Sequence, residues 1–413
     1  MRTTLNRRKF LLSTAAGIGA GALPWRAARA QTGKPVRIGL LTVKTGPLAS
    51  GGVQMEQGIT AFLKDKDYTL AGRKVDFISA DTGGNPAGAK TKAQELIERD
   101  EVDFILGPLA AFELLAITQY VEQHKTPMMS LAGADDLTQR KPNPYFVRAS
   151  ATSSQAMHPM GHYAATEMKL KRVITIDEDF AFGYEQIGGF QQVFEDNGGR
   201  VVKKLWPPLV TADYTPYLAQ ISDVDGVVQG FAGSNPLKFM KQYADSGLKL
   251  PVCGGETAGD DALLPHFGDE AIGLISACPY TIDLDNDANR KFKALLKRDY
   301  DVVAGFYAAG LYVIGMVVEA ALEALHGDTS DKEATIKALR AVNLKDTPRG
   351  SFHFDDLGNV VGNVFIRRVE KVGGSLTNVT IKTYENVGQF WPYDEKAYLA
   401  HPVYSRDYPP LKS

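Results

Sequence analysis

The 413-residue chain is poor in cysteine and in net charge, and both shortages exclude classes of function. Its two cysteines, Cys253 and Cys278, have no CxxC or Cys/His spacing, so a zinc site or a redox motif finds no support. The two thiols either bridge neighbouring strands in an oxidising compartment or remain small buried apolar groups. A formal net charge of -2 gives no basic surface for nucleic acid, which is therefore not an expected partner.

The chain also lacks a long apolar run near its start. Residues 10–23 are apolar but fall short of the roughly 20 residues that a membrane helix needs. They follow Arg7-Arg8 and precede a small-x-small cleavage pattern at residues 28–30. This order predicts a cleaved secretory signal over residues 1–30, similar to the twin-arginine type, with an uncleaved anchor as the alternative. No cysteine lies at the cleavage site, so we expect a soluble periplasmic protein without a lipid anchor.

Catalytic, metal and nucleotide motifs are missing as well. The sequence has neither a G-x-S-x-G elbow nor a P-loop. His158 and His162 share a helix face, but they lack the HExxH acid and a third ligand, so no metal site and no cofactor are expected. A later apolar run, residues 308–325, is interrupted by Glu319 and Glu323, which argues against a membrane span.

What the chain does have is a repeated strand–loop–helix pattern, and its first copy is the clearest. Residues 36–43 form a short apolar run rich in β-branched side chains that stops at the turn Thr45-Gly46-Pro47. Residues 53–64 follow, with Val53 and Ile59 on an apolar helical stripe. This is the opening unit of a parallel α/β sheet, in which ligands bind beyond the carboxyl ends of the strands.

The same alternation continues and predicts two consecutive α/β units. Further strands are expected at residues 75–79, 103–106, 127–130, 172–176, 201–205, 225–229 and 250–253. Helices are expected at residues 87–99, 113–123, 154–168, 185–197 and 236–246, and later at 287–300, 305–326 and 331–342. A β-rich end over residues 350–384 contains a hairpin at residues 355–359.

This order predicts an α/β fold of two doubly wound parallel-sheet lobes joined by three crossover strands. The crossings are expected near Ser150, Tyr280 and Pro348. The predicted lobes are residues 34–150 with 281–347, and residues 151–280 with 348–413. Three linkers between two lobes form a hinge.

An ordered set of segments resembles the periplasmic solute-binding proteins of the leucine/isoleucine/valine-binding type, which are the receptors of ABC importers. The segments include IGLLTVKTGPLASGG, DTGGNPAGAKTKAQELIERDEVDFILGP, TPMMSLAGADDLTQR, FGYEQIGGFQQVFEDNGGRVV and GFYAAGLYVIGMVVEAALEAL. No single segment is decisive, but together they span some 350 residues. The resemblance implies the type I periplasmic binding protein fold, a small-molecule ligand and the importer's membrane permease subunits as partners.

Family positions transfer to this chain one at a time. The resemblance assigns the ligand contacts to the loops after the strands, at Leu48, Gly51, Ala111, Ala132, Ala134, Phe182, Phe231 and Glu256. Ala110, Phe112 and Gly133 lie in the same loops and are further candidates. Gly51 stands where the family often has an aromatic residue. Ala111 and Ala134 replace hydroxyl side chains that hold a ligand carboxylate. Glu256 matches the acid that pairs with an α-amino group.

These departures predict a roomier pocket with flat apolar walls from Phe112, Phe182 and Phe231. A ligand carboxylate could still bind backbone N–H groups at the helix starts after Ala110 and Gly133. We therefore favour an aromatic acid, such as a benzoate or phenylpropanoid derivative, over a branched-chain or other hydrophobic amino acid. Glu256 favours the amino acid, unless it accepts a hydrogen bond from a ligand hydroxyl.

Each of these assignments has a plainer alternative. The three phenylalanines could be core residues, since aromatic side chains mostly pack, and Glu256 could be a solvated loop acid. Lys44 and Arg140 are candidate counter-charges but fit the surface better. As competing functions, a secreted hydrolase would use Ser130 or Ser234 with a histidine, and a sensor ectodomain would leave no motif. We expect a monomeric binding protein that is not an enzyme.

Overall fold

The computed structural model describes residues 33–412, so the predicted signal at residues 1–30 lies outside the described part of the chain. Its first sheet has the strand order β2-β3-β1-β4-β5-β6. The strands are β1 (Val36–Thr42), β2 (Thr69–Leu70), β3 (Arg73–Asp81), β4 (Phe104–Leu106), β5 (Met128–Ser130) and β6 (Phe146–Arg148). All neighbours pair in parallel except β2 and β3. The carboxyl ends of β1, β4 and β5 therefore meet at one edge.

The second sheet has the order β12-β13-β14-β11-β10-β9-β7-β8, with β15 paired to β14. Its strands are β7 (Arg172–Ile176), β8 (Arg200–Leu205), β9 (Gly226–Gln229), β10 (Val252–Gly254), β11 (Ile275–Cys278), β12 (Asn343–Leu344), β13 (Phe352–Phe354), β14 (Val360–Val372) and β15 (Ser375–Val387). Strands β7 to β11 are parallel, whereas β12 to β15 are antiparallel additions. The hairpin predicted at residues 355–359 joins β13 to β14.

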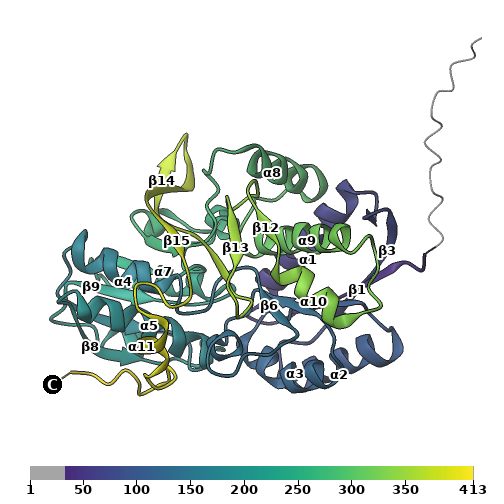
Figure 1. Cartoon of the computed structure of the whole chain (residues 1–413). Helices are drawn as coiled ribbons and strands as arrows, with labels where there is room; N and C mark the ends of the chain where they lie inside the picture. The colour runs from purple at the N-terminus through teal and green to yellow at the C-terminus, as the bar shows by residue number, and fades with distance from the viewer. Residues whose placement is uncertain (1–32, 413) are drawn as a thin grey trace, which may run out of the picture. The chain divides into compact units, whose positions relative to one another are not determined.

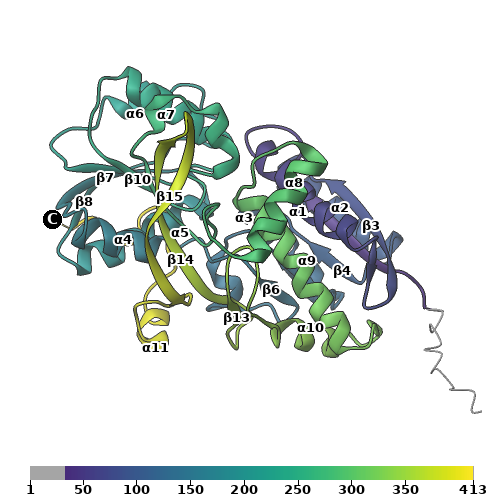
Figure 2. The same cartoon turned by 90° about the horizontal axis from the view of Figure 1, so that it is seen from above.

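Helices from distant parts of the sequence cover the first sheet (Figures 1 and 2). They are α1 (Ala49–Asp65), α2 (Pro86–Gln94), α3 (Ala111–Gln123), α8 (Asp287–Tyr300), α9 (Phe306–Ala324) and α10 (Lys332–Arg340). Within the described residues, α9 is long and apolar enough for a membrane span by composition, but most of it is buried in the core. Its neighbour across that core is α1.

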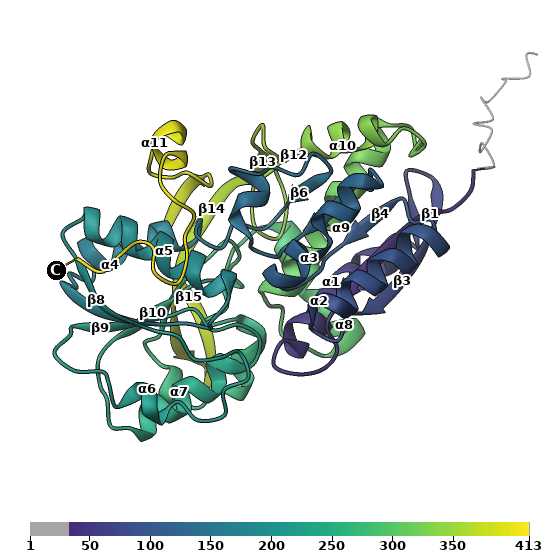
Figure 3. The ribbon, with the colours of Figure 1, turned by 90° about the horizontal axis from the view of Figure 1, so that it is seen from below.

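The second sheet is covered by α4 (Met157–Thr166), α5 (Ala181–Asp196), α6 (Thr215–Leu218), α7 (Asn235–Asp245) and the C-terminal α11 (Glu395–Leu399). The last residues of the chain run along α5 (Figure 3), where Gln191 Nε2 donates to the Pro410 carbonyl at 3.0 Å. Cys253 and Cys278 on neighbouring strands are both free and buried, which supports the apolar alternative for the two thiols.

Some predicted elements need correction. Helix α1 begins at Ala49, and Val53 is 44% exposed, so it does not belong to the buried stripe. Helix α5 begins at Ala181, four residues before the predicted start, and this places Phe182 in its first turn. The sequence pattern gave no strand for β6 or β11, which are three and four residues long.

The chain passes between the two groups of elements after β6, after β11 and after α10. Arg349 ties the first passage to the third, since its Nη1 donates to the carbonyls of Ala149 and Ser150 at 2.8 and 2.7 Å. The predicted lobe boundary at residues 347/348 falls between β12 and β13, which pair with each other.

Candidate functional site

A pocket lies where strand ends of both sheets meet. Its space is about 380 Å³, including the part open to solvent, which suits a small-molecule ligand. The lining residues are Leu48, Leu109, Ala110, Ala111, Leu131, Gly133, Phe180, Phe182, Ala232, Glu256, Thr257, Phe306 and Tyr307. Most of these residues follow the strands β1, β4, β5, β7, β9 and β10, whereas Phe306 and Tyr307 begin α9. This is the position that doubly wound sheets reserve for ligands.

Six of the eleven predicted site residues line this pocket, namely Leu48, Ala110, Ala111, Gly133, Phe182 and Glu256. The other five, Gly51, Phe112, Ala132, Ala134 and Phe231, lie outside the lining. Phe306 and Tyr307 line the pocket without having been predicted, although this aromatic pair after Gly305 lies in a segment that carries the family resemblance. Phe180 was a further available signal, because it stands in the loop after β7.

The extra room expected at Gly51 is absent, and that prediction is wrong. A Cβ atom at Gly51 would lie 2.9 Å from Leu109 Cδ1 and 2.9 Å from Tyr307 Cζ. The Tyr307 ring from α9 therefore fills the space that an aromatic side chain at position 51 would need. The wall is supplied from a distant part of the sequence.

Phe231 packs in the core of the second sheet and lies outside the pocket lining, so its role as a pocket wall stays a prediction. Its side chain is fully buried, and its ring centroid lies 5.1 Å from that of Tyr214 and 4.9 Å from that of Phe239. Phe112 packs behind the pocket lining. Its ring makes an edge-to-face contact with the ring of Phe180, with 5.4 Å between the centroids.

The backbone amides after Gly133, predicted to receive a ligand carboxylate, already bind a carboxylate of the chain. The amides of Ala134 and Asp135 donate to Glu185 Oε2 and Oε1, each at 3.0 Å. Ala134 has φ 63°, a left-handed conformation that turns these amides toward α5. Burial, with the Asp135 carboxylate adding to it, raises the pKa of Glu185 well above its ordinary value.

Ala132 is also fully engaged. Its amide donates to Ser130 Oγ at 2.9 Å, and its carbonyl accepts from Arg148 Nε at 3.0 Å.

On the second-sheet side, the amide of Ala232 donates to both oxygens of Glu178 at 3.2 Å. Burial raises the pKa of Glu178 to about 8.

The start of α3 keeps free donors. Glu113 Oε2 accepts from the Ala110 amide at 3.2 Å. Among the hydrogen bonds of the described residues, the amides of Ala111 and Phe112 have no acceptor. Two unpaired amides at a helix start form a local positive potential that favours an anion.

Glu256 is the one acidic side chain in the lining. It is 4% exposed, and its Oε2 has no hydrogen-bond partner among the described residues. Burial raises the pKa of Glu256 to about 8, although the nearby Arg349 guanidinium lowers it. A buried acceptor without a donor costs free energy, so a ligand that donates to Glu256 gains affinity.

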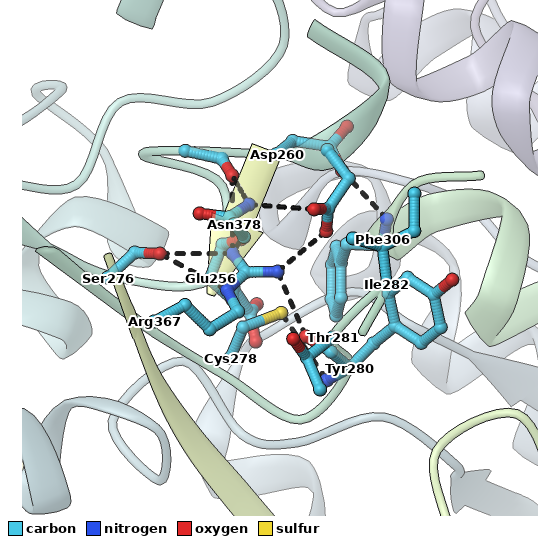
Figure 4. A network of polar contacts seen from close by, with 12 residues as sticks. Glu256, Asp260, Ser276, Cys278, Tyr280, Thr281, Ile282, Phe306, Arg367 and Asn378 are labelled. Atoms are coloured by element: carbon cyan, nitrogen blue, oxygen red, sulfur yellow. Dashed lines mark hydrogen bonds and ion pairs between the residues drawn. The ribbon is translucent and has the colours of Figure 1, made fainter. Parts of the chain in front are cut away.

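Behind Glu256 lies a polar network centred on Arg367 of β14 (Figure 4). Arg367 Nη1 pairs with Asp261 Oδ2 at 2.9 Å and donates to the Tyr280 carbonyl at 2.9 Å. Arg367 Nη2 donates to the Glu256 carbonyl at 3.4 Å. The loop that carries Glu256 is therefore held from behind by a buried cation.

The two sides of the pocket touch through backbone as well as side chains. The Ser234 amide, before α7, donates to the Pro47 carbonyl, before α1, at 3.0 Å. Ser234 Oγ donates to the same carbonyl at 3.3 Å, and Ser130 Oγ donates to the Pro108 carbonyl at 2.6 Å. The two serines considered for a hydrolase thus have carbonyl partners.

A protein of two α/β sheets with a small-molecule pocket between their strand ends has the architecture of a periplasmic binding protein. The family described as periplasmic binding protein matches residues 35–374, and the chain belongs to this family. It is a type I member of the branched-chain amino acid receptor group and a solute-binding protein of an ABC transporter, which confirms the family resemblance and the fold class. The family is periplasmic or extracytoplasmic.

Three relatives show what the chain is similar to. The Leu/Ile/Val-binding protein homolog 6 of Brucella suis biovar 1 is 30% identical over 376 residues, which cover 88% of this chain and 95% of the relative. A solute-binding protein from Rhodopseudomonas palustris BisB5, in complex with 3,4-dihydroxybenzoic acid, is 32% identical with a TM-score of 0.82, covering 86% of this chain and 98% of that one. Another from R. palustris, in complex with 4-hydroxybenzoate, is 29% identical with a TM-score of 0.81, covering 86% and 99%.

Proposed function

We propose that the protein captures an aromatic carboxylate, such as a hydroxylated benzoate, and delivers it to the membrane permease of its importer. The observation that carries this proposal is the pocket lining, in which Phe180, Phe182, Phe306 and Tyr307 supply aromatic surface. Flat rings gain both burial and edge or stacking contacts against such walls. The two R. palustris relatives bind hydroxybenzoates, which supports the same ligand class.

The proposed orientation follows from the two polar ends of the pocket. The ligand carboxylate binds the free amides of Ala111 and Phe112 at the start of α3. A ring hydroxyl donates to Glu256, whose Oε2 lacks a partner. The amides of Ala134 and Ala232 do not bind the ligand carboxylate, because they donate hydrogen bonds to Glu185 and Glu178.

A hydrophobic amino acid is the second candidate, and Glu256 is the observation that favours it. A buried carboxylate facing the pocket fits an α-ammonium group as well as a hydroxyl. The Brucella relative is named as a Leu/Ile/Val-binding homolog. Glu256→Gln should weaken an amino acid far more than benzoate, which has no donor for this position.

A thermal-shift screen tests the ligand class directly. Benzoate, 4-hydroxybenzoate and cinnamate derivatives are compared with leucine, isoleucine, valine and phenylalanine, because a ligand that binds only the folded state raises the unfolding midpoint. A rise confined to the aromatic acids supports the first proposal. A rise confined to the amino acids supports the second and rejects the first.

We further propose that residues 34–150 with 281–347 and residues 151–280 with 348–413 act as two lobes that close on the ligand, with β12 at their boundary. The three passages of the chain supply the hinge. Small-angle scattering should show a smaller radius of gyration with saturating ligand, and an unchanged radius would reject closure.

We propose that the protein acts as a periplasmic monomer without catalysis. A turnover assay on ligand esters can contradict the absence of catalysis.

A further inference from the structure

Helix α9 begins at a residue that cannot cap it. Gly305 is the N-cap residue and has no side chain, while the first amides of a helix need acceptors from elsewhere. The acceptor for Phe306 is Asp260, whose Oδ1 takes a hydrogen bond from the Phe306 amide at 2.7 Å (Figure 4). Phe306 and the following Tyr307 both line the pocket.

Asp260 reaches α9 from the other side of the pocket. It lies in the loop after β10, a strand of the second sheet, whereas α9 packs in the core of the first. Its second oxygen, Oδ2, accepts from Gln54 Nε2 on α1 at 2.9 Å. The Asp260 side chain is 1% exposed, so both hydrogen bonds are sealed from water.

The loop that carries Asp260 is anchored firmly to the second sheet. Arg367 pairs with the neighbouring Asp261, and its Nη2 donates to the Gly259 carbonyl at 3.4 Å. Asn378 on β15 donates to that same carbonyl at 2.7 Å and to Asp261 Oδ1 at 2.8 Å. These bonds hold both neighbours of Asp260, so its carboxylate moves with the second sheet.

We propose that Asp260 is a helix cap across the cleft, a positioning residue that couples closure of the two lobes to the placement of the aromatic wall. Opening the cleft breaks its bonds to Phe306 and Gln54 and leaves the start of α9 uncapped. Closing restores the cap and fixes Phe306 and Tyr307 against the ligand. Asp260 is absent from the pocket lining, so it acts through these residues. This inference rests on the proposed lobe closure.

The test compares Asp260→Ala with the removal of a helix cap whose donor and acceptor lie on the same side of the cleft. Asp331 caps α10 by accepting from the Ala334 amide at 3.0 Å, so Asp331→Ala is the matched control. With 4-hydroxybenzoate and L-leucine as probes, D260A should weaken binding of whichever probe the wild type takes about tenfold, mainly through faster release. D331A should lower the unfolding midpoint while its affinity stays within about twofold of wild type. D260N keeps an acceptor oxygen, so its ligand affinity should lie between those of D260A and D331A.

A second change separates capping from closure. A Cβ at Gly305 would lie 2.6 Å from Asp260 Oδ1, 2.5 Å from Gln54 Oε1 and 2.7 Å from Ala262 Cβ, so Gly305→Ser needs Q54A, D260A and A262G beside it. Compared with the Q54A/D260A/A262G triple variant, the added G305S hydroxyl should raise the unfolding midpoint but leave the affinity low. If G305S also restores the affinity, or if D260A and D331A behave alike, the cross-cleft role is overturned.

If neither probe binds the wild type, the proposed ligand class fails while Asp260 remains testable. The ligand-free lobes still sample the closed state, so amide hydrogen exchange of the ligand-free protein then reports the cap through the peptide that contains Phe306. We expect faster exchange of that peptide in D260A than in the wild type. Equal exchange would show that Asp260 does not cap α9 in solution and would reject the inference.

Discussion

The Glu185 carboxylate accepts a hydrogen bond of 3.0 Å from the backbone amide of Ala134, at the place where a ligand carboxylate was expected. Glu185 comes from α5 on the second sheet, and Ala134 follows β5 on the first. The chain thus supplies its own acceptor to this amide. A ligand acid must be bound elsewhere, and the start of α3 has the free donors.

Removing this internal acceptor should create a site for a small carboxylate. Glu185→Ala leaves the amides of Ala134 and Asp135 unsatisfied, so stability should fall by about 1–3 kcal/mol for each buried donor that loses its partner. Acetate should recover part of that loss in denaturant titrations, and chloride at equal ionic strength should not. The absence of selective recovery would show that these amides do not form an anion site.

The sign of the pH dependence distinguishes the two ligand classes through Glu256. Its pKa of about 8 means that the carboxyl is mostly protonated at pH 6–7 in the empty pocket. An ammonium ligand binds the ionised form and displaces a proton, so affinity for leucine should rise with pH, by up to about tenfold per unit, and level off above pH 8. Benzoate, which is repelled by the ionised carboxylate, should instead bind more weakly above pH 8.

Calorimetric titrations from pH 6 to 9 measure this dependence, and Glu256→Gln is the control. The glutamine does not titrate in this range, so the slope should disappear for either ligand. A slope that survives in E256Q would assign the titration to another group.

Phe182 and Phe231 should respond differently to truncation, although both follow a strand of the second sheet. Phe182 lines the pocket, so Phe182→Ala should reduce the affinity for an aromatic ligand by about 1–3 kcal/mol. Phe231 lies in the core against Tyr214 and Phe239, so Phe231→Ala should lower the free energy of unfolding by about 3–5 kcal/mol. Binding isotherms and denaturant unfolding of both variants separate the two effects. The reverse outcome would mean that Phe231 faces the ligand.

Gly51 should not tolerate a side chain, even though it stands at the expected ligand loop. Gly51→Ala places a methyl group against Leu109 and Tyr307, and such overpacking costs about 1–3 kcal/mol. The displaced Tyr307 ring should also narrow the pocket and weaken binding. Adding Leu109→Ala relieves one of the two contacts, so G51A/L109A should recover part of the affinity. Unchanged binding in G51A would show that the Tyr307 ring is not held there.

Local sequence was sufficient for the fold class, because strand and helix periodicity and turn residues are short-range signals. The strand at β1, the turn at Thr45-Gly46-Pro47 and the helix that follows were readable from about thirty residues. The family resemblance, rather than periodicity, selected Leu48 and Glu256, which lie beyond strand ends and line the pocket. The sequence pattern missed the strand at β6.

Tertiary structure alone decided what occupies the space around those strand ends. The sequence shows that Gly51 lacks a side chain, but only packing reveals that Tyr307 fills the gap. Phe182 and Phe231 have similar local contexts, and their burial against different partners makes one a wall and the other a core residue. The pairings of Glu185 with Ala134 and of Asp260 with Phe306 join residues far apart in the chain. Periodicity reports the face of an element, whereas these contacts depend on how elements from both sheets meet, and that is fixed only when the chain is folded.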